Sequence, residues 1–117
     1  MSTSPFETAL ELVTHVPGVR GAMIVSAADG VVVAEALMDE MKGSAVAALA
    51  ASLVSRLRRA VEGAGRGVPK FVHLTATGGT LLAAPHGEEL ILVAVAERTV
   101  NAGLARIEML RALEILG

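Results

Sequence analysis

The sequence predicts an α+β fold in which a five-stranded antiparallel sheet carries helices on both of its faces. The first observation behind this class is helical periodicity, because three segments repeat apolar residues every three or four positions. The second is a set of five short apolar runs, most of them bounded by Gly or Pro. The third is their order, α-β-β-α-β-β-β-α. Together these elements fit one domain spanning residues 1–117.

The first helix is expected to begin directly after Ser4. Ser4 caps it, Pro5 takes its first position, and Glu7 completes a capping box. Pro17 and Gly18 then end it. Its buried side is expected to contain Phe6, Leu10 and Val13, flanked by Ala9, Leu12 and Val16.

Two strands are expected next, over residues 21–26 and 31–36. The four residues from Ala27 to Gly30 are typical of a hairpin turn between them. Gly30 is free to take a positive φ, which such a turn requires.

A long helix is expected over residues 44–59, where Ala and Leu dominate and Pro is absent. Asp39 or Ser44 is expected to cap it, and the glycines from Gly63 onward end it. Its large apolar stripe is expected to lie on the sheet and comprises Val46, Leu49, Ala50, Leu53, Leu57, Ala60 and Val61. Its small, uncharged face is expected to meet a backbone from outside this chain and comprises Ala47, Ala48, Ala51, Ser52 and Ser55.

Three further strands are expected over residues 70–77, 80–84 and 89–96. The first alternates with a period of two, so its two faces differ. One face carries Phe71, His73, Thr75 and Thr77, and the other carries Val72, Leu74 and Ala76. The last strand is almost entirely apolar, and we expect it to be central and buried on both faces.

The final helix is expected to be capped by Thr99 or Asn101. Its leucine-rich stripe is predicted to face inward and comprises Leu104, Ile107, Leu110, Leu113 and Leu116. Glu108, Arg111 and Glu114 form a ladder of charges at i, i+3 spacing on the other side.

Composition excludes several classes of function. The chain is 53% hydrophobic and only 19% charged, so burial within an oligomer is the simplest outlet for its apolar residues. No apolar run is long enough to cross a membrane, and no signal peptide precedes the first helix. A net charge of −2, with two Phe and no Trp or Tyr, argues against binding of nucleic acid. The absence of Cys fits a cytoplasmic protein without thiolate metal sites.

The polar residues do not predict a catalytic or metal site. The three histidines lie in separate elements without metal-ligand spacing; they are His15, His73 and His86. Glu88 and Glu89 lie in a turn and are expected to be solvated, and Ser26 and Asp29 flank a hairpin without a base or an orienting group. We therefore expect no enzymatic activity, no catalytic residue and no cofactor.

Two features could be taken for ligand sites. The glycine-rich stretch from Gly63 to Lys70 leaves a helix and enters a strand, the wrong polarity for a phosphate-binding loop. Four arginines gather at the end of the long helix; they are Arg56, Arg58, Arg59 and Arg66. They either complement the helix dipole or form the basic rim of a partner-binding surface.

Three parts of the chain together resemble the Roadblock dynein light-chain family, and most of all its bacterial gliding-regulator (MglB-like) branch. The first is VPGVRGAMIVS at 16–26 with DGVVVA at 29–34, and the second is the long Ala/Leu-rich helix. The third is TGGTLLAAP at 77–85, followed by the strand at 90–96 and NAGLAR at 101–106. The likeness extends from about Pro5 to Leu116.

The resemblance implies a two-fold homodimer. The strand at 70–77 would pair with its twin into one ten-stranded sheet, and the two long helices would pack beside each other. The dimer interface that the resemblance implies comprises Ala47, Ala48, Ala51, Ser52, Ser55, Phe71, His73 and Thr75. The exposed edge of an unpaired strand gives a physical reason for such pairing.

The resemblance also implies a partner. Members of this family serve as platforms for small Ras-like GTPases, as GTPase regulators, or as adaptor subunits, and the gliding regulators act without inserting an arginine finger. The implied platform comprises Ala47, Ala51, Ser55, Arg58 and Arg59. Binding and regulation of a small Ras-like GTPase is therefore the first hypothesis, a structural scaffold without a GTPase is the second, and a small-molecule sensor or enzyme on a profilin-like sandwich is the third.

Overall fold

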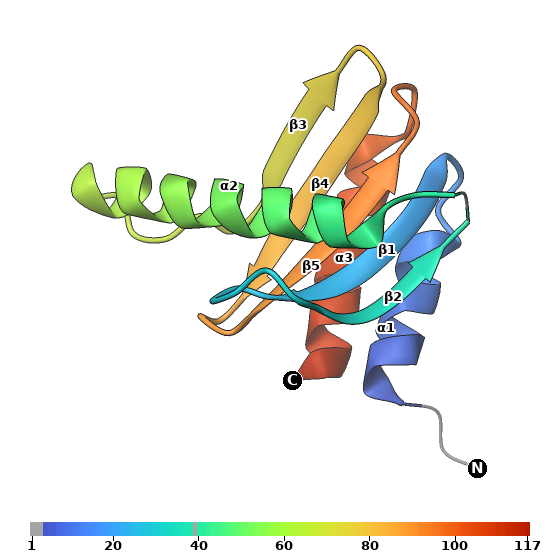
Figure 1. Cartoon of the computed structure of the whole chain (residues 1–117), viewed down its shortest axis with the longest axis horizontal. Coiled ribbons are helices and arrows are strands. Elements are labelled where there is room, and N and C mark those ends of the chain that lie inside the picture. The colour runs from blue at the N-terminus through green and yellow to red at the C-terminus, as the bar shows by residue number, and fades with distance from the viewer. Residues whose placement is uncertain (1–3, 39) are drawn as a thin grey trace.

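The computed structural model describes residues 4–38 and 40–117 and contains the expected elements in the expected order. In Figure 1 one helix crosses the near face of the sheet and the other two lie behind it. The helices are α1 (Pro5–Thr14), α2 (Gly43–Gly63) and α3 (Ala102–Leu116). The strands are β1 (Val19–Ser26), β2 (Val32–Leu37), β3 (Val72–Ala76), β4 (Gly79–His86) and β5 (Leu90–Ala96). The predicted fold class is confirmed.

The sheet has the order β2-β1-β5-β4-β3, and every neighbouring pair is antiparallel. The last strand in the sequence, β5, therefore lies at its centre, between β1 and β4, while β2 and β3 form the two edges. Strand β5 is buried on both faces, as predicted. Leu92 and Ala94 belong to the core beneath α1 and α3, whereas Ile91 and Val93 belong to the core beneath α2.

Two of the three helix starts agree with the sequence. Ser4 Oγ accepts a hydrogen bond from the Phe6 N–H at 3.3 Å, and Asn101 Oδ1 accepts one from the Leu104 N–H at 3.0 Å. The donor to Ser4 Oγ is the N–H of Phe6 and not that of Glu7, which a capping box requires. The predicted capping box is therefore not formed. Of the two candidates for α3, Asn101 is the cap and Thr99 is not.

The start of α2 differs from the prediction. Lys42 occupies the N-cap without a side-chain hydrogen bond, Ser44 lies inside the helix, and Asp39 lies outside the described residues. A carboxylate oxygen of Glu35, on β2, instead lies close to Gly43. A negative charge there interacts favourably with the positive end of the helix dipole. A neutral hydroxyl cap would interact with it more weakly.

The face of α2 that covers the sheet takes residues from both predicted faces, so the predicted orientation of this helix is right only in part. Ala50 is buried, and Val46 and Leu53 pack against the core as expected, but Ala47 and Ala51 of the small face are buried as well. The buried residues of α2 are Gly43, Ala47, Ala50, Ala51 and Val54. Ala47 has no exposed surface and Ala51 is 8% exposed, whereas Leu49, expected on the sheet, is 56% exposed. Short side chains let the helix lie close to the strands and fill the narrow space above Met23 and Val93.

The backbone that approaches the small face belongs to this chain. Gly30, in the β1–β2 turn, has φ +70°, and a Cβ added to it would lie 3.3 Å from the Ala48 Cα and 3.4 Å from the Ala51 Cβ. The turn therefore packs directly on α2, where we expected a second molecule. Alanine at positions 48 and 51 is what makes room for it.

The buried face of helix α3 also differs in part from the prediction. Its buried residues are Ala105, Met109 and Ala112, while Leu104, Ile107 and Leu110, predicted to face inward, are exposed. Leu113 and Leu116 are half-buried against the core, in agreement with the prediction. The expected ladder is present in part, because Arg111 Nη1 lies 3.0 Å from Glu108 Oε1.

Replacing Gly30 by alanine should lower the free energy of unfolding by about 2 kcal/mol, since it adds a positive-φ penalty to a steric conflict with α2. Gly65 is the matched control, because its φ is also +70° but nothing lies within 4 Å of an added Cβ. Gly65→Ala should cost about 1 kcal/mol in the same urea titration. Equal losses for both variants would mean that the turn does not press on α2.

Enlarging Ala47 to leucine should lower the free energy of unfolding by about 1–3 kcal/mol, because the space beneath α2 has no room for three more carbon atoms. Ala45→Leu, at an exposed position of the same helix, should change it by less than about 0.5 kcal/mol. Chemical denaturation followed by circular dichroism measures both. If Ala47→Leu leaves the free energy of unfolding unchanged, Ala47 is not tightly packed between α2 and the sheet.

Candidate functional site

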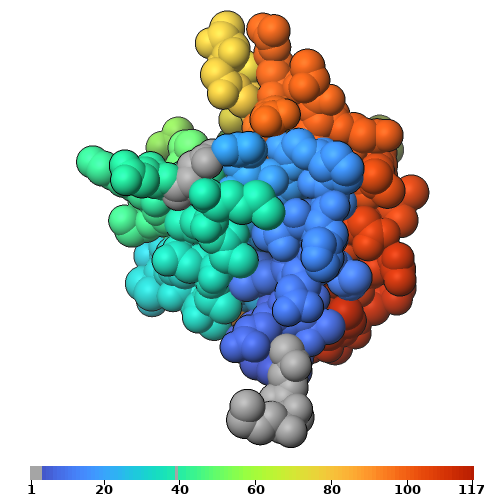
Figure 2. All heavy atoms as spheres, turned by 90° about the vertical axis from the view of Figure 1, so that its right-hand side faces the viewer, coloured from blue at the N-terminus to red at the C-terminus, as the bar shows by residue number. Residues whose placement is uncertain are grey.

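The free edge of the sheet and the free part of α2 lie on the same side of the molecule. Strand β3 pairs with β4 from Val72 to Ala76, and no other strand of the described chain pairs with it. Figure 1 shows α2 continuing past this edge, and its buried residues end at Val54, about two turns before Gly63. Figure 2 shows the tip of the β3–β4 hairpin standing out from the body of the protein. The unpaired backbone groups of β3 and the uncovered end of α2 are therefore both exposed on this side of the molecule.

An apolar groove lies between the first half of α2 and the free edge strand β3, and we call it the α2–β3 groove. It has a volume of about 210 Å³ and is lined by Val46, Leu49, Leu74, Ala76, Gly79, Thr80, Leu81 and Val95. Leu49 on α2 is 56% exposed and Leu74 on β3 is 43% exposed. Two large aliphatic side chains facing solvent beside an unpaired strand are typical of a surface that another protein covers.

Only some of the predicted interface residues lie where a second molecule can reach them. Ala48, Ser52 and Ser55 are exposed on α2, whereas Ala47 and Ala51 are covered by the sheet and the β1–β2 turn. The burial of Ala47 and Ala51 removes both from a surface role in the single chain. The helical spacing identifies Leu49 as part of the apolar stripe of α2, but it predicts that this side chain lies on the sheet and not at the surface.

The predicted residues on β3 lie on the opposite face from the groove. His73 and Thr75 are exposed, with His73 Nε2 3.3 Å from Thr75 Oγ1. Phe71 is half-buried, packs against the core beneath α1 and α3, and has the Arg106 guanidinium 5.4 Å from the centre of its ring. The alternation along β3 was predicted correctly. Sequence reasoning missed Leu74 as a site residue because it gave the interface only to the other face.

The arginines at the end of α2 do not act alike. Arg58 is half-buried, and its Nη2 donates a hydrogen bond to the Gly87 carbonyl oxygen, 3.1 Å away in the β4–β5 turn. Arg59 is exposed, with its Nη2 3.5 Å from Ser55 Oγ. Arg58 therefore ties α2 to the sheet, while Arg56 and Arg59 remain on the surface.

A small polar hollow lies between the β1–β2 turn and α2, next to Ser52 and Ser55. Its volume is about 270 Å³, and Asp29 is its only ionisable lining residue. A hydrogen bond from the Ser26 side chain, together with one from the Val31 N–H, holds the pKa of Asp29 below its usual value. The carboxylate is therefore ionised across the physiological range and gives this end of the α2 surface a negative charge.

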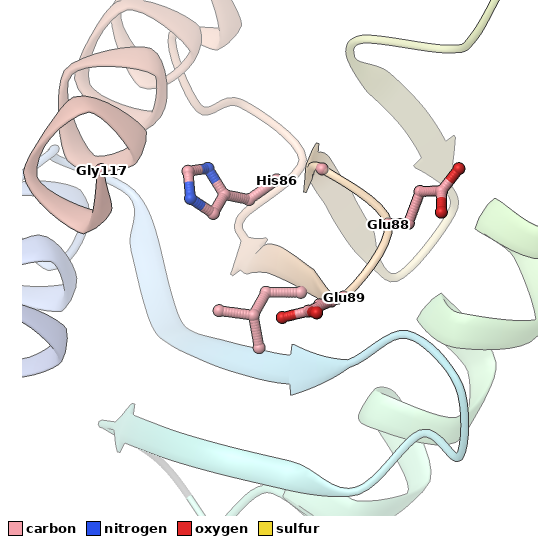
Figure 3. A pocket seen from close by; sticks show the side chains of 6 residues that line it. His86, Glu88, Glu89 and Gly117 are labelled. Atoms are coloured by element: carbon pink, nitrogen blue, oxygen red, sulfur yellow. The ribbon is translucent and has the colours of Figure 1, made fainter.

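The other polar candidates are not brought together. Figure 3 shows the hollow beside the β4–β5 turn, where His86 points toward the end of α3 while Glu88 points the other way, toward α2. Among the described residues, no three His, Asp or Glu side chains cluster closely enough to hold a metal ion. The stretch from Gly63 to Lys70 leaves the end of α2 and leads into β3, so its polarity is the predicted one. We find no nucleophile with a base and an orienting group in this part of the chain.

Within residues 4–38 and 40–117, no helix combines the length and apolar character that crossing a bilayer requires.

Known structures share this fold closely. A Roadblock/LC7 domain from Streptomyces avermitilis superposes with a TM-score of 0.82 at 25% identity, covering 95% of this chain and 93% of that one. MglB from Myxococcus xanthus gives a TM-score of 0.84 at 16% identity, covering 97% and 92%. An MglB with a tetrameric arrangement gives 0.82 at 21% identity, covering 99% and 90%. The two MglB structures share the fold with this chain at these identities.

Sequence comparison identifies the family directly. No curated protein matches the chain as a whole. The family model described as the Roadblock/LC7 domain, however, matches residues 5–96, which include α1, α2 and all five strands. The chain therefore belongs to the Roadblock/LC7 domain family.

Proposed function

We propose that this protein is a non-enzymatic homodimer that binds and regulates a small Ras-like GTPase. The observation that carries the proposal is the α2–β3 groove lying beside the unpaired edge of β3. Exposed apolar side chains and unpaired backbone groups are both unfavourable in water. A second copy related by a two-fold axis would cover the groove and pair with the strand edge at the same time. Membership of the Roadblock/LC7 family and the likeness to MglB structures support the choice.

The dimer would combine strand pairing with helix packing. Antiparallel pairing of β3 with its twin would extend the sheet from five to ten strands and satisfy the backbone groups at this edge. Leu49 and Leu74 would be buried near the two-fold axis, and the overhanging end of α2 would lie over the partner. Helix α2 has 21 residues and is about 32 Å long, so two copies offer roughly the 800 Å² per side that a stable interface needs.

The GTPase would bind across the outer surfaces of the paired α2 helices. Ala48, Ser52 and Ser55 are exposed there, small and uncharged, so a partner's backbone can approach closely without displacing long side chains. Asp29 at one end and Arg59 at the other give the surface charges of opposite sign. Regulation would come from the shape that this surface imposes on the GTPase, since we assign no catalytic residue to the platform.

Leu74→Asp should weaken self-association at least tenfold, because it places a charge in the α2–β3 groove beside the pairing edge. Leu104→Asp, at a similarly exposed leucine on α3, should leave it unchanged. Sedimentation velocity at micromolar concentration measures both. A Leu74→Asp protein that stays folded and fully dimeric would exclude the proposed interface.

Ser52→Arg should weaken GTPase binding at least tenfold, since the long charged side chain keeps a partner from α2, and sedimentation velocity shows whether the variant still dimerises. Val33→Arg, at an exposed position on β2, is the control. Binding is measured by pull-down of a small Ras-like GTPase loaded with a non-hydrolysable GTP analogue. Equal binding by both variants would remove the platform, and a dimer that binds no such GTPase in either nucleotide state would favour the scaffold hypothesis.

A further inference from the structure

A second groove, distinct from the α2–β3 groove, lies beneath the projecting end of α2. It is bounded by the loop that follows α2, the β4–β5 turn and the second half of α3, and its volume is about 460 Å³. We call it the Arg58 groove. Its size falls within the range of sites that hold a few side chains or a small ligand.

The floor and walls of the Arg58 groove are aliphatic. Val68 and Pro69 come from the loop, Pro85 from β4, and Leu110 and Leu113 from α3. Val68 is 54% exposed and Leu110 is 40% exposed, so both present their side chains to the solvent. Burial of one more aliphatic side chain among these residues is favourable by the ordinary hydrophobic effect.

The border of the groove is basic. Arg58 and Lys70 line it together with a single carboxylate, that of Glu88. The surrounding segment from residue 56 to 70 contains five of the chain's ten Lys and Arg residues and only one acidic residue, Glu62. A chain of net charge −2 thus concentrates positive charge around one apolar groove, which attracts ligands of negative charge.

The hydrogen bonding of Arg58 is incomplete in the free protein. Its Nη2 donates to the Gly87 carbonyl, but its Nε is buried and has no partner among the described residues. Arg58 also lines the groove, and a carboxylate forms stronger, charge-assisted hydrogen bonds with a guanidinium than a neutral acceptor does. The groove thus offers an acidic ligand an arginine that is already held in place at one end.

We propose that the Arg58 groove binds a linear segment of a partner protein in which aliphatic side chains alternate with Asp or Glu. The aliphatic side chain would lie between Val68 and Leu110, and the flanking carboxylates would pair with Arg58 and Lys70. A segment with several carboxylates fits better than a small monocarboxylate, since the exposed Arg59 and Arg66 continue the basic surface beyond the groove.

The probe is the peptide acetyl-Asp-Leu-Glu-Leu-amide, titrated into the ¹⁵N-labelled full chain at low ionic strength. Amide resonances of Val68, Gly87 and Leu110 should shift together, and the shifts should weaken as salt is added. Leu110→Asp and Lys70→Glu should each reduce the affinity at least tenfold. Ile107→Asp and Arg111→Glu, on the same helix but outside the groove, should reduce it less than twofold.

Two control peptides separate the contributions of charge and apolar contact. Acetyl-Asn-Leu-Gln-Leu-amide lacks the carboxylates and acetyl-Asp-Ser-Glu-Ser-amide lacks the aliphatic side chains, so each should bind at least tenfold more weakly. Binding that survives Leu110→Asp, equal binding of the uncharged peptide, or no shifts at millimolar peptide would overturn the proposal. Resonances of the groove that respond to protein concentration but not to peptide would assign it to a second copy and overturn it as well.

Discussion

The structure depends on close contact between helices and sheet through alanine. Helix α2 rests on the strands through Ala47, Ala50 and Ala51, and α3 buries Ala105 and Ala112 in the core that it shares with α1. Short side chains bring the helix axis near the sheet and bury backbone as well as side-chain surface. Several larger side chains of the same helices then face the solvent; they include Leu49, Leu104, Ile107 and Leu110. The exposed leucines of this protein are a consequence of how its core is packed.

That packing explains which parts of the structure the sequence could predict. Element order, the central position of β5 and the alternation along β3 follow from local patterns and were predicted, and the cap at Asn101 was one of two candidates. The orientation of α2 was predicted only in part, because both of its faces are free of charge and periodicity alone does not say which one is inside. We chose the larger residues, which is the right choice only where the helix lies at the usual distance from a sheet.

The site was predicted in part for the same reason. Ala48, Ser52 and Ser55 are exposed where a partner can reach them, while Ala47 and Ala51 are not. Leu49 and Leu74 give the α2–β3 groove its apolar character, and both stand in segments that the sequence had marked as amphipathic. The apolar walls of the Arg58 groove had no local signal, since they come from three separate segments that only the fold brings together. Its one trace in the sequence was the gathering of positive charge after residue 56.

The central place of the last strand also bears on how the chain is made. Until β5 leaves the ribosome, β1 can pair only with β2, and β3 only with β4, because β5 is the strand that joins these two hairpins. Isolated hairpins are marginally stable, and closing the loop between β1 and β5 costs entropy that only the finished sheet repays. Synthesis therefore releases most of this domain before its core can form. Cooperative folding of the whole domain, and not stepwise addition of elements, is the natural outcome for this order of strands.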